Sequence, residues 1–128
     1  MPAQNRLVKH VLIAEDDTEV RGVLEDLLSG AGYLPIAAED GLEALDWLSR
    51  LPVDLIIVDI LMPRLDGREL INRVRHTSRW AAIPIMVLSA YADLDRYRDL
   101  PVEDVELKPF QLTDLLEKVR QLIGPAGA

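Results

Sequence analysis

The chain has 128 residues, the usual size of one domain, and 49% of them are hydrophobic, so it can bury a core. A formal net charge of -8 argues against a nucleic-acid or membrane partner, because phosphate backbones and anionic headgroups attract basic surfaces. The absence of cysteine excludes disulfides, thiol nucleophiles and thiolate metal sites. The chain has neither a signal-peptide pattern nor an apolar run of the roughly 20 residues that cross a bilayer, so we expect a soluble, cytoplasmic protein.

Apolar runs and helical patterns alternate along the whole chain. Apolar runs typical of strands cover 8–14, 33–38, 53–59 and 82–88, with a shorter run within 101–107; those at 8–14 and 53–59 have the pattern of strands buried on both faces. Helical spacing covers 18–31, 41–51, 67–77, 93–100 and 112–123. This alternation predicts an α/β fold, with one doubly wound parallel sheet of five strands and helices on both faces. We expect a single domain over residues 1–128, with its core at about 8–123 and flexible ends at 1–7 and 124–128.

Polar and glycine residues mark the ends of the first two predicted helices. Asp17 or Thr18 can cap the first helix, Asp40 can cap the second, and Gly30 and Gly32 can end the first. Apolar residues three or four positions apart should face the core. They are Val20, Val23, Leu24, Leu27, Leu28 and Ala31 in the first helix, and Leu42, Ala44, Leu45 and Leu48 in the second.

Polar side chains also stand at the ends of several predicted strands. Glu15, Asp16 and Asp17 follow the first strand, Asp59 ends the third, Ser89 follows the fourth and Lys108 follows the fifth. Right-handed crossovers bring the carboxyl ends of parallel strands to one edge of the sheet, where such folds bind ligands. Each residue alone has an ordinary explanation as a strand end, a turn or a helix cap. Their joint placement at one edge predicts a functional site.

These side chains suit the transfer of a phosphoryl group to a carboxylate. Two carboxylates about 4 Å apart repel each other by about 4 kcal/mol at an effective dielectric near 20, and a divalent cation relieves that repulsion. A site made of oxygen ligands favours Mg²⁺, whereas two histidines and no cysteine give little support for zinc. We therefore expect Asp59 to be the nucleophile and to hold Mg²⁺ together with Asp16. Lys108 would pair with the phosphoryl group, and Ser89 would hydrogen-bond it.

Motifs spread over nearly the whole chain resemble one family. They are VLIAEDD (11–17), AEDGLEAL (38–45), DLIIVDILMPRLDG (54–67), PIMVLSA (84–90) and LKPF (107–110). Each is weak alone, but together they resemble the receiver domain of response regulators in two-component signalling, the CheY-like domains. The resemblance implies a flavodoxin-like (βα)5 fold with strand order 2-1-3-4-5. It also implies a cis peptide bond between Lys108 and Pro109.

The resemblance further implies how the site works. Asp59 would take a phosphoryl group from a histidine kinase or a phosphotransfer protein and so switch the binding of a downstream protein. Mg²⁺ would be held by Asp16, Asp59 and the backbone carbonyl of Leu61, with Glu15 acting through water. The chain would not be an enzyme in the ordinary sense, since it would catalyse only its own phosphorylation and slow dephosphorylation.

The chain departs from the family's pattern near its fifth strand. Ser89 stands at the family's switch hydroxyl and Lys108 at its phosphate-pairing lysine, but the stretch between them is shorter than usual by about one helical turn. Val105 occupies the position where the family commonly has an aromatic switch residue. The signal would then leave through Ser89 and its loop, with Tyr91 or Tyr97 in place of the missing aromatic.

Other functions stay open at this point. A receiver-like interaction module could act without phosphorylation, because the region of Val105 is changed. The enzyme alternative is a Mg²⁺-dependent phosphatase with an aspartate nucleophile, but the haloacid-dehalogenase type has an Asp-x-Asp motif and a cap domain, and Asp59 is followed by Ile60 and Leu61. No output domain follows Ala128, so we expect a stand-alone phosphoacceptor; a receiver excised from a longer regulator is the alternative.

Overall fold

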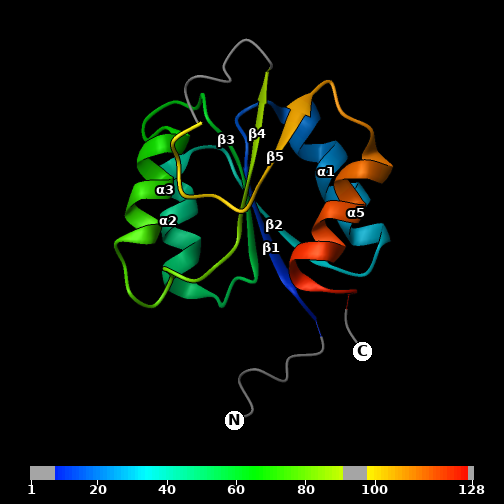
Figure 1. The fold of residues 1–128 in the computed structure, drawn as a ribbon, viewed down its shortest axis with the longest axis horizontal. Coiled ribbons are helices and arrows are strands. Elements are labelled where there is room, and N and C mark those ends of the chain that lie inside the picture. The colour runs from blue at the N-terminus through cyan, green and yellow to red at the C-terminus, as the bar shows by residue number, and fades with distance from the viewer. Residues whose placement is uncertain (1–7, 91–97, 127–128) are drawn as a thin grey trace.

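The computed structural model describes residues 8–90 and 98–126. The helices and strands of these residues are β1 (His10–Ala14), α1 (Thr18–Gly30), β2 (Leu34–Ala38), α2 (Gly41–Arg50), β3 (Leu55–Asp59), α3 (Gly67–Arg75), β4 (Ile85–Ala90), β5 (Asp104–Lys108) and α5 (Leu112–Ile123). The strands form one sheet in the order β2-β1-β3-β4-β5, and every neighbouring pair is parallel (Figure 1). The predicted fold and the strand order are therefore confirmed. Within the described ranges no helix is long and apolar enough to cross a membrane.

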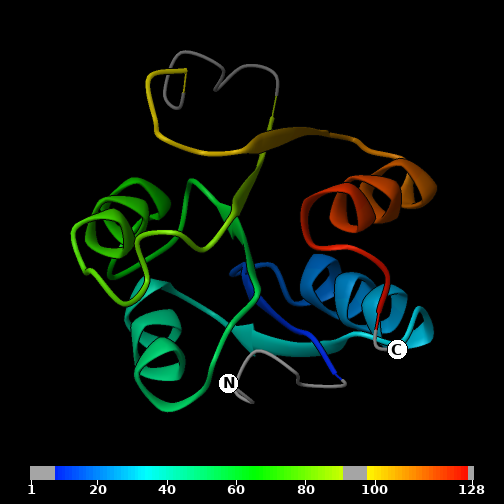
Figure 2. The ribbon, with the colours of Figure 1, turned by 60° about the horizontal axis from the view of Figure 1, so that its bottom comes forward.

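Helices cover both faces of the sheet. α2 and α3 lie on one face, and α1 and α5 lie on the other, as the views in Figures 1 and 2 agree. Each face has its own apolar core: Leu12 and Leu70 belong to the core under α2 and α3, whereas Ile13 and Leu24 belong to the core under α1 and α5. Successive residues of a strand point to opposite faces, so neighbours such as Leu12 and Ile13 enter different cores. This is why the central strands are apolar at nearly every position.

Three of the helices begin at an aspartate that caps them. The side chain of Asp17 accepts hydrogen bonds from backbone N–H groups in the first turn of α1, and Asp40 and Asp66 do the same for α2 and α3. Asp17, rather than Thr18, is thus the cap of the first helix, and the prediction for Asp40 is confirmed. Gly32 follows α1 with a φ of 96°, a left-handed conformation in which glycine has no steric penalty.

Several predicted boundaries and burial assignments were wrong. The fourth strand runs from Ile85 to Ala90 rather than over 82–88, so Ser89 lies inside β4 and not after it. Val23 and Leu42, which were expected to face the core, are 45% and 44% exposed. Of the helix predicted over 93–100, residues 93–97 lie outside the described residues, and 98–100 form a turn. The last helix, Leu112–Ile123, has the predicted bounds.

Arg75, at the end of α3, ties the loop before β4 to the segment before β5. Its guanidinium donates to the backbone carbonyls of Ala81, Ile83 and Pro101 at 2.7–2.9 Å and to the carboxylate of Glu103 at 2.7 Å. The same Glu103 oxygen accepts from the N–H of Ile85 at 2.7 Å. The Arg75 side chain is only 14% exposed, so these contacts satisfy its donors away from most solvent.

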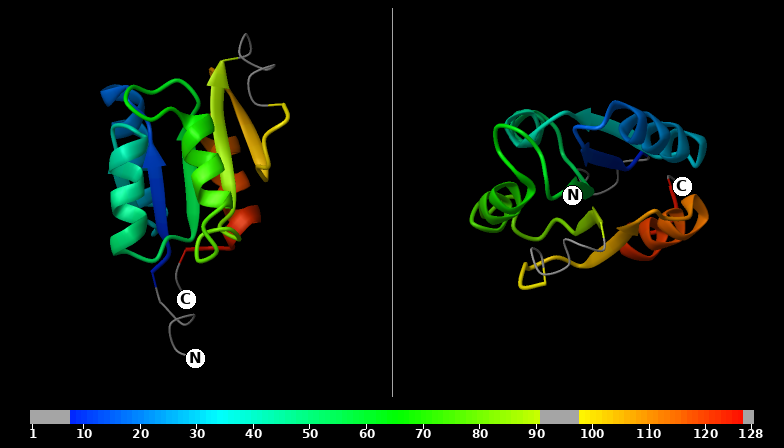
Figure 3. Two further views of the ribbon diagram at one scale, coloured as in Figure 1. Left: turned by 90° about the vertical axis from the view of Figure 1, so that its left-hand side faces the viewer. Right: turned by 90° about the horizontal axis from the view of Figure 1, so that it is seen from above.

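The start of β1 and the end of α5 are held together. The ammonium of Lys9 donates to the carbonyls of Ile123 and Pro125, the latter at 3.0 Å. The hydroxyl of Tyr33 donates to the carbonyl of Gly124 at 2.6 Å. These contacts lie at the amino-terminal end of the strands, the lower end in Figure 1 and in the left view of Figure 3. The carboxyl ends of the strands, where the predicted site lies, are at the opposite end.

Candidate functional site

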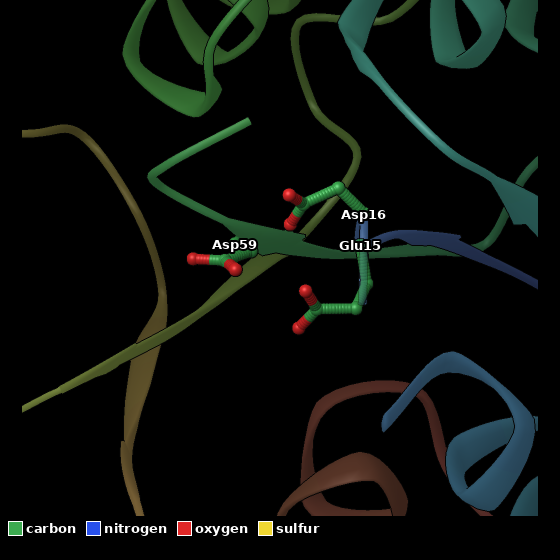
Figure 4. A group of neighbouring side chains, drawn as sticks. All are labelled: Glu15, Asp16 and Asp59. Atoms are coloured by element: carbon green, nitrogen blue, oxygen red, sulfur yellow. The ribbon is translucent and has the colours of Figure 1, made fainter. Parts of the chain in front are cut away.

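Three carboxylates meet at the carboxyl-terminal edge of the sheet (Figure 4). Glu15 and Asp16 directly follow β1, and Asp59 is the last residue of the neighbouring strand β3. One carboxylate oxygen of each lies within 4.8 Å of those of the other two, and the side chains of Glu15 and Asp16 extend toward the side of Asp59. Glu15 and Asp59 are 0% and 9% exposed, whereas Asp16 is exposed. The cluster can therefore be reached from solvent on the side of Asp16.

Lys108, the last residue of β5, brings a positive charge to this cluster. Its Nζ donates to Oε1 of Glu15 at 3.1 Å and to Oδ2 of Asp59 at 3.3 Å. Burial by itself lowers the pKa of Lys108, but the hydrogen bonds and charges of Glu15 and Asp59 outweigh burial and raise the pKa overall. The lysine is thus held in its charged form, where it balances one of the three carboxylates.

The surroundings of Glu15 raise the pKa of its carboxyl from 4.5 to about 7. The largest cause is burial, followed by the hydrogen bond and the negative charge of Asp59. The N–H of Asp17, which donates to Oε2 of Glu15 at 3.1 Å, and the ammonium of Lys108 act in the opposite direction without cancelling the rise. The raised pKa thus reflects first the burial of Glu15 and second the closeness of the Asp59 carboxylate.

The side chain of Asp59 is held by the residues that follow it. The N–H of Leu61 donates to Oδ1 of Asp59 at 3.2 Å, so the two oxygens of this carboxylate face different donors, Leu61 and Lys108. Gly67, the first residue of α3, donates its N–H to the carbonyl of Ile60 at 2.9 Å. A Cβ atom on Gly67 would lie 2.4 Å from the carbonyl oxygen of Asp59, so only glycine fits this close approach.

The donor set of the cluster fits a hard divalent cation. It consists of the carboxylate oxygens of Glu15, Asp16 and Asp59, and among the described residues no histidine belongs to it. Mg²⁺ takes oxygen ligands and usually keeps several of its waters, which the open side at Asp16 allows. The negative charge of Asp59, which adds to burial in raising the pKa of Glu15, is a charge that a cation would neutralise.

Comparison with known proteins shows to which family the chain belongs. Residues 11–120 match the response regulator receiver domain. The chain belongs to this family. It is 40% identical over 117 residues to the sensor histidine kinase TmoS of Ectopseudomonas mendocina, and 37% identical over 116 residues to the response regulator MprA of Mycobacterium sp. strain KMS. These matches cover 89% and 88% of the chain but only 12% and 50% of the two relatives, so the chain spans half of their length or less.

A solved receiver domain has the same fold. The receiver domain of a sensor histidine kinase from Pseudomonas aeruginosa PAO1 superimposes with a TM-score of 0.85 at 28% identity, over 91% of this chain and 98% of that one. That structure has a magnesium ion coordinated in its active site cleft.

In the chain described here, the predicted site residues lie at one edge of the sheet, but not all of them are in contact. Glu15, Asp59 and Lys108 touch one another, and Asp16 completes the acidic cluster. Ser89 is buried in β4, and its hydroxyl makes a long contact of 3.4 Å with the carbonyl of Ala90. Among residues 8–90 and 98–126, no hydrogen bond joins Ser89 to the cluster.

The departures noted near the fifth strand have different outcomes. Val105 lies in β5, half-buried, and packs against the core under α2 and α3. Tyr91 and Tyr97, the suggested substitutes for an aromatic switch residue, lie outside the described residues. The peptide bond between Lys108 and Pro109 is cis, as the family resemblance implied.

The structure adds two arginines to the surroundings of the receiver site. Arg21 of α1 donates to the carbonyl of Glu15 at 2.7 Å and, more weakly, to that of Asp16 at 3.4 Å. Its place in the first turn of α1 could have indicated a contact with the preceding loop. Arg64 pairs with Asp40, and no sequence signal links these two residues, which are 24 positions apart in different loops.

Proposed function

We propose that this chain, as one receiver domain over residues 1–128, accepts a phosphoryl group on Asp59 from a histidine kinase or a phosphotransfer protein. Phosphorylation would then change its binding to a downstream protein. The observation that carries this proposal is the convergence of Asp59, two further acids and Lys108 at one edge of the sheet. Aspartate is a competent nucleophile, and phosphoryl transfer depends mainly on positioning and on charge stabilisation.

The chain's own residues have distinct parts in this step. A carboxylate oxygen of Asp59 attacks the phosphorus atom; a P–O bond forms, the P–N bond to the donor histidine breaks, and the imidazole keeps that electron pair. The ammonium of Lys108, which lies between Glu15 and Asp59, is placed to pair with a phosphoryl oxygen. Ser89, from the adjacent strand β4, would donate its hydroxyl to another.

We propose that the ion of this site is Mg²⁺. Asp16, Asp59 and the backbone carbonyl of Leu61 would hold it, and Glu15 would act through water. When bound, the ion neutralises charge on the phosphoryl oxygens and on the carboxylates. The acidic cluster of this chain and the magnesium ion in the receiver domain from Pseudomonas aeruginosa support this assignment.

An apolar hollow beside the site supports a protein as the phosphoryl donor. The hollow has a volume of about 400 Å³ and opens next to Lys108, between α1 and the start of α5. Two of its lining residues, Val23 and Leu112, are 45% and 40% exposed. Exposed apolar side chains gathered next to a reactive group favour docking of another protein surface there.

The proposal can be tested with a small phosphoryl donor. Wild type, Asp59→Asn and Asp46→Asn are incubated with acetyl phosphate, with and without Mg²⁺, and the intact mass of each is measured. Asp46 is an exposed acid on α2 that pairs with Arg50, so its variant controls for unspecific modification. We expect wild type and Asp46→Asn to gain one phosphoryl group only with Mg²⁺, and Asp59→Asn to gain none.

The other outcomes separate the alternatives. A wild type that binds Mg²⁺ in calorimetry but stays unmodified would need its protein donor. A wild type that neither binds Mg²⁺ nor gains mass would contradict the proposal and favour an interaction module that works without phosphorylation, the alternative that Val105 suggests. Repeated turnover of a phosphomonoester would instead indicate a phosphatase.

A further inference from the structure

Arg64, in the loop between β3 and α3, has an unusual backbone conformation. Its φ is 64°, and it is the non-glycine residue with a positive φ among residues 8–90 and 98–126. Residues with a Cβ rarely adopt this left-handed conformation, and asparagine and glycine adopt it most readily. From this position the side chain of Arg64 makes close contacts.

Those contacts go to one buried carboxylate. Nε and Nη2 of Arg64 lie 2.7 Å and 2.6 Å from Oδ2 of Asp40, whose side chain is 7% exposed. The other oxygen of Asp40 accepts the N–H of Glu43 at 2.9 Å and so caps α2. Burial raises the pKa of Asp40, but the N–H of Glu43 and the guanidinium of Arg64 outweigh it, and the pKa is lowered overall. Asp40 is thus a buried charge that depends on Arg64 for its partner.

The same two loops touch through their backbones. The N–H of Gly41, next to Asp40, donates to the carbonyl of Leu65, next to Arg64, at 3.0 Å. A Cβ on Gly41 would lie 2.3 Å from that carbonyl oxygen, so the loops pack without room for a side chain. The start of α2 and the loop 60–66 are therefore joined at two neighbouring residues on each side.

This loop also carries the groups at the phosphoacceptor. It begins directly after Asp59 and contains Leu61, whose N–H donates to Asp59 Oδ1 and whose carbonyl is the proposed ligand of Mg²⁺. At its far end, Gly67 donates to the carbonyl of Ile60. The position of the Leu61 peptide is thus set by a loop that is fixed at its two ends by β3 and α3 and in between by the contact with α2.

We propose that the Arg64–Asp40 pair positions the Leu61 peptide and thereby sets the affinity of the receiver domain for Mg²⁺. Arg64 and Asp40 are positioning residues, since they act on the site only through the loop. Groups that orient metal ligands without touching the metal commonly change metal affinity by 10- to 100-fold when they are removed. This inference rests on the proposed function, because it takes Mg²⁺ as the ion of the site.

The test compares the affinity for Mg²⁺ alone, measured by calorimetry, across a small set of variants. Arg64→Asn removes the guanidinium but keeps a residue that tolerates the left-handed conformation. Asp40→Asn keeps an oxygen that can cap α2 but removes the charge that Arg64 binds. Arg64→Lys restores a positive charge with one donor group. Arg50→Ala is the matched control, since Arg50 belongs to α2 and pairs with Asp46 on the surface, 65% and 54% exposed.

We expect the dissociation constant of Mg²⁺ to rise about tenfold in Arg64→Asn and in Asp40→Asn. The double variant should be no weaker than either single variant, because both changes remove the same interaction. Arg64→Lys should lie between wild type and Arg64→Asn, and Arg50→Ala should match wild type. In the metal-free protein, the amide hydrogen of Leu61 should exchange faster in Arg64→Asn than in wild type or Arg50→Ala.

Melting temperatures of all variants separate positioning from stability. If Arg64→Asn and Asp40→Asn melt at lower temperature but bind Mg²⁺ as wild type does, the pair only stabilises the fold and the inference is wrong. If wild type itself does not bind Mg²⁺, the metal site of the proposed function fails and the inference fails with it. If wild type binds Mg²⁺ and the variants match it, only the positioning role is overturned.

Discussion

The raised pKa of Glu15 predicts that the binding of Mg²⁺ depends on pH near neutrality. If the cluster binds Mg²⁺, the ion and a proton compete for the carboxylate of Glu15, so the ion should bind the form in which Glu15 is deprotonated. With a pKa of about 7, Glu15 is ionised to about one tenth at about pH 6 and to about nine tenths at about pH 8. The dissociation constant of Mg²⁺ should therefore fall about tenfold between about pH 6 and about pH 8.

Calorimetry in two buffers with different heats of ionisation measures both the affinity and the protons released. Binding should release nearly one proton at the lower pH and almost none at the higher pH. Glu15→Gln should remove most of this dependence, because it keeps the shape of the side chain but not the titrating group. Asp46→Asn, at an exposed acid away from the cluster, should keep it. Equal affinity at both pH values, or the same slope in Glu15→Gln, would refute the reasoning.

The same pKa makes a prediction for the stability of the metal-free protein. A folded-state pKa above the usual 4.5 means that the folded protein binds this proton more tightly than the unfolded chain does. The tighter binding of this proton stabilises the folded state fully below about pH 4.5. This stabilisation is lost as the pH rises through about 7, which lowers the free energy of unfolding by about 3 kcal/mol. Urea unfolding without Mg²⁺ should show this loss between these pH values, and Glu15→Gln should reduce it.

Two further predictions concern the packing around the site. Gly67→Ala should lower the free energy of unfolding by about 1–3 kcal/mol, because its Cβ would lie 2.4 Å from the carbonyl oxygen of Asp59, whereas Gly22→Ala, with nothing within 4 Å, should raise it by about 0.5–1 kcal/mol. Urea unfolding of both variants checks this, and equal effects would contradict it. Arg75→Ala should lower the free energy of unfolding by about 2–4 kcal/mol, because three backbone carbonyls and the Glu103 carboxylate lose their hydrogen-bond donor. Arg75→Lys should recover only a minor part of this loss. A loss below the error of the measurement would contradict the prediction and show that water replaces the hydrogen bonds of Arg75.

Much of the fold could be predicted because the pattern of this sequence has few competing solutions. The third strand is buried at all five positions and ends on Asp59, so its place at the centre of a parallel sheet follows from its apolar run. The errors in strand bounds and in burial occurred where an apolar residue type does not indicate whether the residue lies in a strand or faces the core. Ile83 and Pro84 extend the run before β4, but the carbonyl of Ile83 binds Arg75 and the strand begins only at Ile85. Helical spacing likewise does not indicate how much of the apolar face of a helix is covered by the sheet, and Val23, which lies on this face, is exposed.

The candidate site was predictable at the level of the edge and not at the level of contacts. Strand ends placed Glu15, Asp59 and Lys108 together because parallel topology fixes which ends meet. The sequence could not indicate that Lys108 lies between two acids, since this depends on the length and twist of β5 relative to β1 and β3. The Arg64–Asp40 pair could not be predicted for the same reason, because the two residues lie in loops that meet only in the folded protein.

The contacts of Lys9 and Tyr33 with the end of α5 bring the two ends of the folded receiver domain side by side. Both ends of the folded unit leave it at the same place, beside the amino-terminal ends of the strands. Asp59 lies at the other end of the sheet. A segment joined at either end would therefore start from the side of the sheet opposite Asp59, away from the acidic cluster.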